Sequence, residues 1–318
     1  MIVQDNRLVS THFPASLSVQ GAAPLPLAAL HLGGQGRHDW HQLQHLGPIH
    51  YSADGLADPL TDSAGHTFRH DFGDSLVQCT SNAPASSVIL PHHLPCDPRH
   101  IPAAMGFAFA QQWARFGLAC IHGALLEVAG TGVLVLGQRG AGKSVLATSA
   151  LVAGGGIVSD DYLLAGELDG TLMGERIRSF LSLRASWAAR TLFDNAPGAW
   201  RSGRTGSRSF LGIEDDDPRF PEHCRINRVW ILSRPRAGRR EDSILEPASQ
   251  AELYTALVSA TQPLLLGPDF PHERNRLTQL LSRLAGLAPA RLETGQDIVL
   301  DPQATWQRLL ALANSPHF

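Results

Sequence analysis

The feature that most constrains this chain of 318 residues is a glycine-rich octapeptide, GQRGAGKS, at residues 137–144. It fits the pattern G-x-x-x-x-G-K-[ST]. An apolar run at Val133–Leu136 precedes it, and a helix-compatible run at Val145–Ala153 follows it. In a strand–loop–helix unit of this kind, backbone N–H groups of the loop and the positive end of the helix dipole face the same anion. The octapeptide therefore predicts a nucleotide-phosphate site in an α/β domain.

Lys143 lies in this octapeptide and is the only lysine of the chain, since the other 25 of the 26 basic residues are arginine. Lysine carries a compact ammonium group on a flexible stem, which the planar arginine fork does not reproduce. We expect Lys143 to reach the terminal phosphates and the Ser144 hydroxyl to ligate Mg²⁺. The predicted nucleotide-binding residues are Gly137, Gln138, Arg139, Gly140, Ala141, Gly142, Lys143 and Ser144.

Two adjacent carboxylates, Asp160 and Asp161, follow the next apolar strand at Ile157–Ser159. We expect this strand to be the parallel neighbour of Val133–Leu136. The carboxyl ends of the two strands, and with them the acidic pair and the octapeptide, would then meet at one edge of the sheet. One carboxylate can then hold Mg²⁺, and the other can accept a proton from an attacking hydroxyl. A solvated acidic turn is the alternative interpretation. For His122, which precedes the strands, the alternative is a core histidine satisfied by backbone groups.

Composition excludes several classes of protein. Apolar residues make up 43% of the chain and charged residues 17%, which is enough for a core and unlike a disordered or collagen-like chain. A net charge of −3 gives no electrostatic reason to expect nucleic acid as a partner. No apolar run reaches the length of a membrane span, and no signal peptide is recognisable. Four scattered cysteines without CxxC spacing favour a reducing cytoplasm over a disulfide framework or zinc site.

The rest of the chain is predicted in coarser terms. Residues 1–100 form a small, mainly β N-terminal domain, and residues 101–318 form the catalytic domain. Five histidines at residues 31–50 are expected to be solvated or core side chains rather than a metal site, since no pattern of cysteine or carboxylate completes such a site. Predicted helices span Pro102–Cys120, Leu181–Phe193, Gln250–Ser259, His272–Leu284 and Pro302–Ala313, the last with Asp301 as its N-cap. Predicted strands include Ala124–Val128 and Arg225–Leu232, and Arg201–Ser209 is predicted as a mobile loop.

The segment from His122 to Asp161 resembles the catalytic domain of HPr kinase/phosphorylase and its kinase-only relatives. The shared elements are His122-Gly123, the octapeptide, and Asp160-Asp161 after the next strand, in the spacing of that family. The resemblance covers roughly residues 115–180 and implies a P-loop kinase domain of the HPr-kinase/PEP-carboxykinase-like type. It also implies ATP and Mg²⁺ as cofactors.

The resemblance assigns roles to individual residues. Asp161 becomes the proton acceptor for a serine-type hydroxyl, Asp160 lies near the metal, and His122 lies in the active site. Glu175 is an imperfect match to the metal-ligating glutamate of the family, with a surface salt-bridging hairpin as its alternative. Arg225 lies closest in spacing to the family's active-site arginine. Arg201, Arg204, Arg208 and Arg228 are the other arginines considered for contact with the terminal phosphate.

The departures from the family pattern shape the function that we expect. No counterpart to the segment associated with phosphorolysis is present, and the N-terminal hundred residues are more similar to kinases that phosphorylate lasso-peptide precursors. We therefore expect a kinase that acts on a serine of a small protein or peptide, with neither nucleic acid nor membrane as a partner. Because the bifunctional relatives form hexamers, a homo-oligomer is a further expectation. A small-molecule kinase and a non-catalytic, nucleotide-gated peptide-binding module are the alternatives.

Overall fold

The computed structural model describes about two thirds of the chain, and all structural statements below concern this part. The described residues are 2–4, 7–10, 12–13, 16–20, 49–53, 66–71, 76–82, 85–89, 110, 113–114, 116–138, 140–177, 180–184, 188, 191–192, 201–202, 208–212, 217–233, 241–261 and 271–315. Arg139, Arg204 and four of the five clustered histidines lie outside them. By contact density the chain divides into two compact units, residues 1–120 with 264–277 and residues 121–263 with 278–318. The boundary expected near residue 100 stays a prediction.

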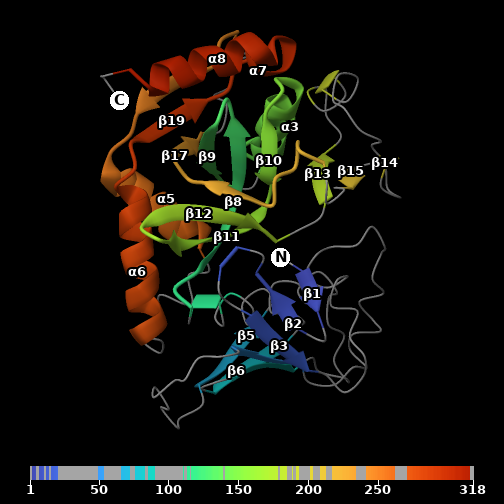
Figure 1. Ribbon diagram of the computed structural model, residues 1–318, viewed down its shortest axis with the longest axis vertical. Coiled ribbons are helices and arrows are strands. Elements are labelled where there is room, and N and C mark those ends of the chain that lie inside the picture. Colours follow the sequence, from blue (N-terminus) through green and yellow to red (C-terminus); the bar gives the residue numbers. More distant parts are fainter. Residues whose placement is uncertain are drawn as a thin grey trace. The chain divides into compact units, whose positions relative to one another are not determined.

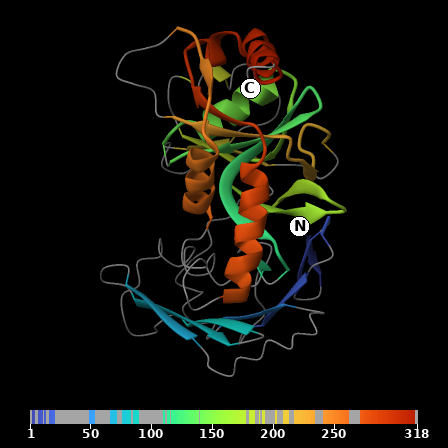
Figure 2. The ribbon, with the colours of Figure 1, turned by 90° about the vertical axis from the view of Figure 1, so that its left-hand side faces the viewer.

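The first unit contains one antiparallel sheet. Its seven strands follow the order β1-β2-β3-β4-β7-β6-β5. They are β1 (Ile2–Gln4), β2 (Arg7–Val9), β3 (Ser16–Gln20), β4 (Ile49–Ala53), β5 (His66–Asp71), β6 (Leu76–Asn82) and β7 (Ala85–Ile89). Figure 2 shows them as one layer that runs from the blue strands to the cyan strands. This sheet agrees with the mainly β character predicted for the N-terminal region.

The second unit is a mixed α/β structure that carries the octapeptide. Its main sheet follows the order β16-β12-β11-β8-β9-β17-β19-β18, and β10 pairs with β8 beside this path (Figure 1). The strands are β8 (Ala119–Val128), β9 (Thr131–Leu136), β10 (Gly156–Ser159), β11 (Tyr162–Leu168), β12 (Thr171–Arg176), β16 (His223–Arg225), β17 (Arg228–Leu232), β18 (Ile244–Pro247) and β19 (Pro289–Glu293). A smaller sheet joins β13 (Phe180–Arg184), β15 (Arg208–Gly212) and β14 (Arg201–Ser202). The helices of this unit are α3 (Lys143–Val152), α5 (Gln250–Ala260), α7 (Asp297–Leu300) and α8 (Pro302–Ala313). Helix α6 (Pro271–Ala285) belongs to the first unit up to Leu277 and to the second unit from Thr278.

The α/β fold class is confirmed, and the octapeptide lies between strand β9 and helix α3 as expected, but the expected pairing of two strands is wrong. β9 and β10 are not neighbours, because β8 lies between them and is antiparallel to both. Glu127 of β8 pairs with Gly132 of β9 and with Gly156 of β10. Since both outer strands are antiparallel to β8, they run in the same direction and end at the same edge of the sheet. The carboxyl ends of β9 and β10 therefore lie on either side of the amino-terminal half of β8.

Three predicted elements have different boundaries in the structure. The helix predicted at Pro102–Cys120 gives way to a strand from Ala119, after a turn in which Gly117 has a φ of +78°. The helix predicted at Leu181–Phe193 begins instead as β13, where Leu181 and Leu183 alternate with polar residues in the two-residue period of a strand. The predicted loop at Arg201–Ser209 contains strands β14 and β15.

The strand predicted at Arg225–Leu232 is two strands, β16 and β17, because the chain changes its pairing partner between them. Cys224 pairs with Gly174 of β12, whereas Val229 pairs with Leu134 of β9. Between the two strands, the Asn227 amide N–H donates to the Gly132 carbonyl, and the Asn227 side chain accepts from the Gly132 N–H. These bonds give hydrogen-bond partners to the backbone groups of Asn227 and Gly132 at the point where the chain changes its pairing partner from β12 to β9.

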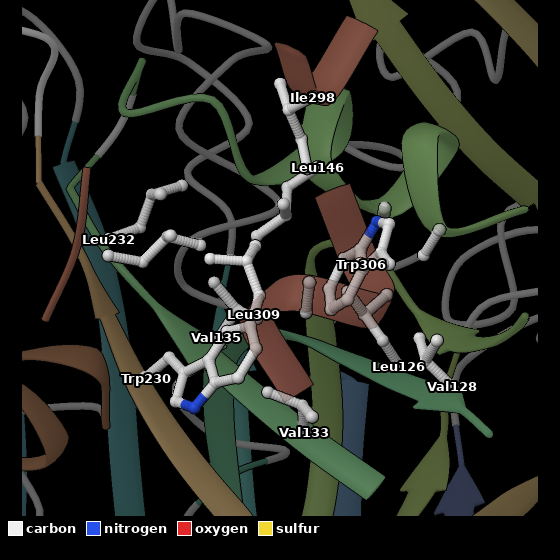
Figure 3. Close-up of a cluster of buried hydrophobic side chains, with 14 of the residues drawn as sticks. Leu126, Val128, Val133, Val135, Leu146, Trp230, Leu232, Ile298, Trp306 and Leu309 are labelled. Carbon is white, nitrogen blue, oxygen red and sulfur yellow. The ribbon is translucent and has the colours of Figure 1, made fainter. Parts of the chain in front are cut away.

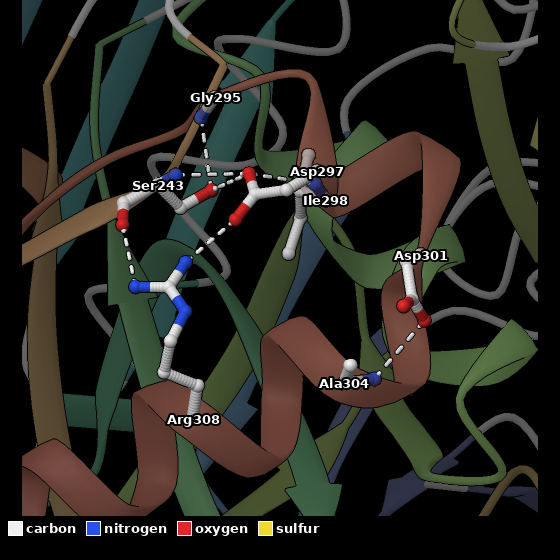
Figure 4. Close-up of polar contacts among 7 residues, drawn as sticks. All are labelled: Ser243, Gly295, Asp297, Ile298, Asp301, Ala304 and Arg308. Atoms are coloured by element: carbon white, nitrogen blue, oxygen red, sulfur yellow. Dashed lines mark hydrogen bonds and ion pairs between the residues drawn. The ribbon is translucent and has the colours of Figure 1, made fainter.

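The predicted helices at α5, α6 and α8 are confirmed, and α8 closes the core over β9 and α3. The Asp301 side chain accepts a hydrogen bond from the Ala304 N–H, as expected for an N-cap (Figure 4). Inside the core the Trp306 ring stacks on Trp230, with ring centroids 5.7 Å apart (Figure 3). The Trp306 indole donates to the Ser149 hydroxyl of α3 at 3.0 Å. The cluster thereby holds α3, and with it the loop that α3 follows, against the sheet.

A polar network on the other side of α8 fixes the amino-terminal end of α7. The Ser243 hydroxyl donates to Asp297 and accepts from the Gly295 N–H (Figure 4). The Arg308 guanidinium donates to both the Asp297 carboxylate and the Ser243 carbonyl. These four hydrogen bonds join Ser243, in the segment before β18, with α7 and α8, so the edge of the sheet is anchored to the helical layer.

We expect Gly132→Ala to destabilise the fold by about 2 kcal/mol or more. A Cβ atom at this position would overlap the Arg225 carbonyl oxygen and lie 3.1 Å from the Cys224 sulfur, at the crossing between β16 and β17. Urea denaturation measures the change. Gly286→Ala is the matched control, because its Cβ would approach the nearest atom only to 3.2 Å. Equal unfolding midpoints for the two variants would contradict the packing described for Gly132.

Candidate active site

The octapeptide forms a tight loop between β9 and α3. Gly140 and Gly142 have φ values of +85° and +107°, which side-chain-bearing residues rarely adopt. Gly137 is required for a different reason, since a Cβ atom there would lie 3.0 Å from the Leu232 carbonyl oxygen of β17. The glycines therefore allow both the turn and the close approach of the loop to the neighbouring strand.

The amino-terminal end of α3 is built to receive an anion. Its N-cap is Gly142, which has no side chain to cap the helix, and the first turn contains no acidic residue. The first N–H groups of a helix have no partner within the helix, and they carry the positive end of its dipole. A phosphate group bound at this loop would accept hydrogen bonds from these N–H groups.

Lys143 is the first residue of α3, and its side chain is buried in the loop. Its Nζ donates to the Gly137 carbonyl at 2.6 Å. Burial lowers the pKa of Lys143 from its ordinary value, while the negative charges of Asp161 and Asp160 act in the opposite direction. The ammonium group thus lies within the electrostatic field of both carboxylates, as the chemistry expected from the sequence requires.

Asp160 and Asp161 occupy the two-residue turn that joins β10 to β11. The Ser159 hydroxyl donates to the Tyr162 carbonyl at 2.6 Å and closes this turn. Asp160 is buried, whereas the Asp161 side chain is 35% exposed. A buried carboxylate near Lys143 and a half-exposed one beside it suit two different tasks, charge neutralisation at the loop and contact with an incoming group.

His122 contacts Asp161 directly. It lies within β8, one residue before Gly123, which pairs with Leu136 at the end of β9. The His122 Nε2 atom is 3.0 Å from Asp161 Oδ1, and the imidazole is 32% exposed. The alternative of a buried core histidine is therefore wrong. The antiparallel strand between β9 and β10 places this imidazole at the sheet edge that carries both the loop and the acidic turn.

Glu175 lies in β12, opposite Leu164 of β11, and its side chain is completely buried. The next residue, Arg176, is also buried and donates to the Phe220 carbonyl at 2.8 Å. The alternative of an exposed salt-bridging hairpin is therefore wrong for these two side chains. The role of Glu175 as a metal ligand stays a prediction.

Arg225 is not brought to the loop. Its carbonyl lies against Gly132, at the opposite end of β9 from Gly137. Gly132 and Gly137 are five residue steps apart along an extended strand, which corresponds to about 16 Å. Arg228 pairs with Val133 at the same distant end, and its guanidinium donates to Asn314. Spacing along the chain suggested Arg225, but the crossing from β16 to β17 places both arginines at the end of β9 that is far from the octapeptide loop.

The donor set suits a magnesium ion that a nucleotide helps to hold. Among the described residues, no three side chains of His, Cys, Asp or Glu cluster in a way that could cage a metal. Mg²⁺ commonly takes only one or two carboxylates and completes its shell with phosphate oxygens and water. Asp160, buried beside Lys143, and Ser144, in the first turn of α3, fit this mode.

Tyr162 is a site residue that the sequence analysis did not identify. Its ring stacks on the His122 imidazole, with centroids 4.9 Å apart and an angle of 26° between the ring planes. The only signal in the sequence is an aromatic residue directly after the acidic pair, and this signal has no meaning until β8 is known to lie next to β11.

None of the helices in the described part of the chain combines the length and apolar character needed to cross a membrane.

Part of the chain matches known proteins. HPr kinase/phosphorylase from Clostridium botulinum (strain Eklund 17B / Type B) is 41% identical over 54 residues, which is 17% of this chain and 18% of that protein. HPr kinase/phosphorylase from Azoarcus sp. (strain BH72) is 34% identical over 157 residues, with 42% of this chain and 47% of that protein covered. The chain thus matches about half or less of the length of these relatives. No protein-family model matches it.

A solved structure, that of the Hpr(Ser) kinase/phosphatase from Coxiella burnetii, aligns with a TM-score of 0.31 and 12% identity. The alignment covers 61% of this chain and 88% of that one, and a likeness of this size carries no argument about function. The curated sequence matches make this chain a divergent relative of the HPr kinase/phosphorylases.

We expect the Lys143 amine to titrate below the ordinary lysine value of 10.5, because burial disfavours the ammonium form. Since the chain has one lysine, ¹³Cε-lysine labelling gives a single side-chain resonance for this titration. Bound ATP should raise the midpoint again, because phosphate oxygens favour the charged amine.

The same shift has a consequence for stability. The unfolded chain binds the lysine proton more tightly than the folded chain, so the contribution of Lys143 to stability should increase as pH rises from its lowered pKa towards 10.5. Lys143→Met should abolish this part of the pH dependence. A resonance that titrates at or above 10.5 would contradict the buried position of the amine.

Proposed function

We propose that this relative of the HPr kinase/phosphorylases transfers the terminal phosphate of ATP to a serine-type hydroxyl of a small protein or peptide. The observation that carries the proposal is the contact of Asp161 with His122 at the same sheet edge as the Lys143 loop. A nucleotide-binding loop alone would serve many activities. A half-exposed carboxylate beside that loop adds a group that can take a proton from an acceptor.

The loop and its helix would hold the nucleotide. In this proposal the phosphates lie along residues 137–144, where they replace the Gly137 carbonyl as the partner of the Lys143 ammonium. Ser144 and Asp160 would hold Mg²⁺, with Glu175 as a further candidate, and the ion would supply charge neutralisation at the phosphates. Lys143 neutralises the same oxygens from the protein side, so the loop stabilises the charge that is redistributed during transfer.

Asp161 would act as the general base. Its side chain is exposed enough to meet an incoming hydroxyl, and its Oδ1 atom contacts Nε2 of the His122 imidazole. That contact fixes the direction in which the carboxylate faces. Removal of the hydroxyl proton as the oxygen attacks the terminal phosphorus is the role of the base in kinases of other folds as well.

The class of acceptor follows from the relatives. The names of the matched proteins identify HPr as their substrate, and an exposed base suits a hydroxyl carried by another polypeptide. The resemblance of the N-terminal region to precursor-peptide kinases favours a peptide of that kind. A small-molecule acceptor and a binding module without turnover are the alternatives that the experiment distinguishes.

We expect Asp161→Asn to reduce phosphate transfer at least about 100-fold while ATP affinity changes little, because the general base contributes to transfer and not to nucleotide binding. The assay follows γ-³²P from ATP, with Mg²⁺, into size-fractionated extract of the source cell. Asp169→Asn is the matched control. Asp169 is exposed at the tip of the β11–β12 hairpin with a φ of +48°, which asparagine tolerates.

The labelled fraction decides among the alternatives. Label in a polypeptide fraction, lost with Asp161→Asn and kept with Asp169→Asn, would support the proposal. Label in a metabolite fraction would favour a small-molecule kinase instead. Label that stays in ATP, or appears only as free phosphate, would favour the binding module and overturn the kinase proposal.

A further inference from the structure

We propose that Tyr162 is a positioning residue that orients the His122 imidazole against the carboxylate of Asp161. The inference rests on the proposed function, in which His122 fixes the direction of the general base. It adds a residue whose effect on transfer would be exerted through another side chain, without contact of its own with the phosphates.

Two consecutive residues hold the imidazole by two different parts of its ring. Asp161 contacts the edge, with Oδ1 3.0 Å from Nε2. Tyr162 covers a face, with its ring centroid 4.9 Å from that of the imidazole and the planes 26° apart. A single contact at one nitrogen leaves the imidazole free to rotate about the line through that contact. The stacked ring removes this freedom, so the two contacts together define the plane of the imidazole.

The need for such support follows from the position of His122. Its side chain is 32% exposed at the edge of the sheet, so close packing on all sides does not immobilise it. Aromatic pairs of this kind favour their stacked arrangement by about 2- to 13-fold beyond the effect of burial. An imidazole that loses this preference would spend more time turned away from Asp161, and the carboxylate would lose its fixed direction.

The main chain at Tyr162 is fixed by the turn that precedes it and by the strand pairing that follows it. Before it, the Ser159 hydroxyl, 4% exposed, donates to the Tyr162 carbonyl at 2.6 Å. After it, Leu163 pairs with Arg176 in the ladder between β11 and β12. Adjacent side chains of a regular strand point to opposite faces. The turn closed by Ser159 is what allows Asp161 and Tyr162 to reach the same imidazole.

The first test separates the ring of Tyr162 from its hydroxyl. Tyr162→Phe keeps the ring and should retain kcat for transfer to the labelled fraction within about threefold. Tyr162→Leu removes the ring and should lower kcat about tenfold, with KM for ATP unchanged, because the nucleotide contacts are untouched. Tyr254→Leu, on α5, is the matched control for loss of a tyrosine ring. Equal losses for the Phe and Leu variants would assign the effect to the hydroxyl and overturn the proposal.

The second test does not depend on activity. In ¹³C-histidine NMR spectra, assigned with His122→Asn, the ring current of the stacked tyrosine should shift the His122 ring protons upfield. The shift should persist in Tyr162→Phe and disappear in Tyr162→Leu. Its absence from the wild-type spectrum would overturn the proposal whether or not the protein is a kinase.

The third test asks whether Tyr162 acts through His122. In a His122→Asn background, Tyr162→Leu should lower kcat less than about twofold further, because the two substitutions remove the same interaction. Full additivity would overturn the positioning role. If even the wild-type protein transfers no label, the proposed function fails, and the NMR shift alone then decides whether Tyr162 orients His122.

Discussion

The antiparallel pairing of β8 with both β9 and β10 is the constraint on which the site depends. The phosphate loop follows β9, the acidic turn follows β10, and His122 lies in the strand between them. Because the outer strands share one direction, their ends meet at one edge, and the middle strand contributes a side chain to the gap that separates them. The site is thus assembled by hydrogen-bonded register, with little dependence on the conformation of long loops.

Electrostatics gives this edge its chemical character. Burial disfavours the charged form of Lys143 even though two carboxylates favour it, and the uncapped end of α3 adds positive potential at the same place. Phosphate oxygens would compensate both. Asp161 differs from Asp160 mainly in exposure, so one pair of adjacent residues supplies a buried carboxylate and a solvent-accessible one.

The sequence predicted the local units well and the long-range pairing poorly. The loop, α3 and the Asp301 cap follow from glycine positions and periodicity, which are local properties of the chain. The partners of β8 and the crossing at Asn227 depend on which strands meet, and short apolar runs carry no such information. For that reason Arg225 was a candidate by spacing although it lies at the far end of β9, and the contact of Tyr162 with His122 was missed.

The turn between β8 and β9 has a consequence for how such a chain can diverge. Ala129 and Gly130 have φ values of 50° and 73°, the two-residue hairpin geometry that fixes strand register. An insertion of one residue in β8 between His122 and the hairpin would reverse the face of the side chains beyond it and turn His122 away from the acidic turn. Relatives that keep this chemistry should therefore vary in length beyond the hairpin, at positions such as the tip between β11 and β12, and not between His122 and the loop.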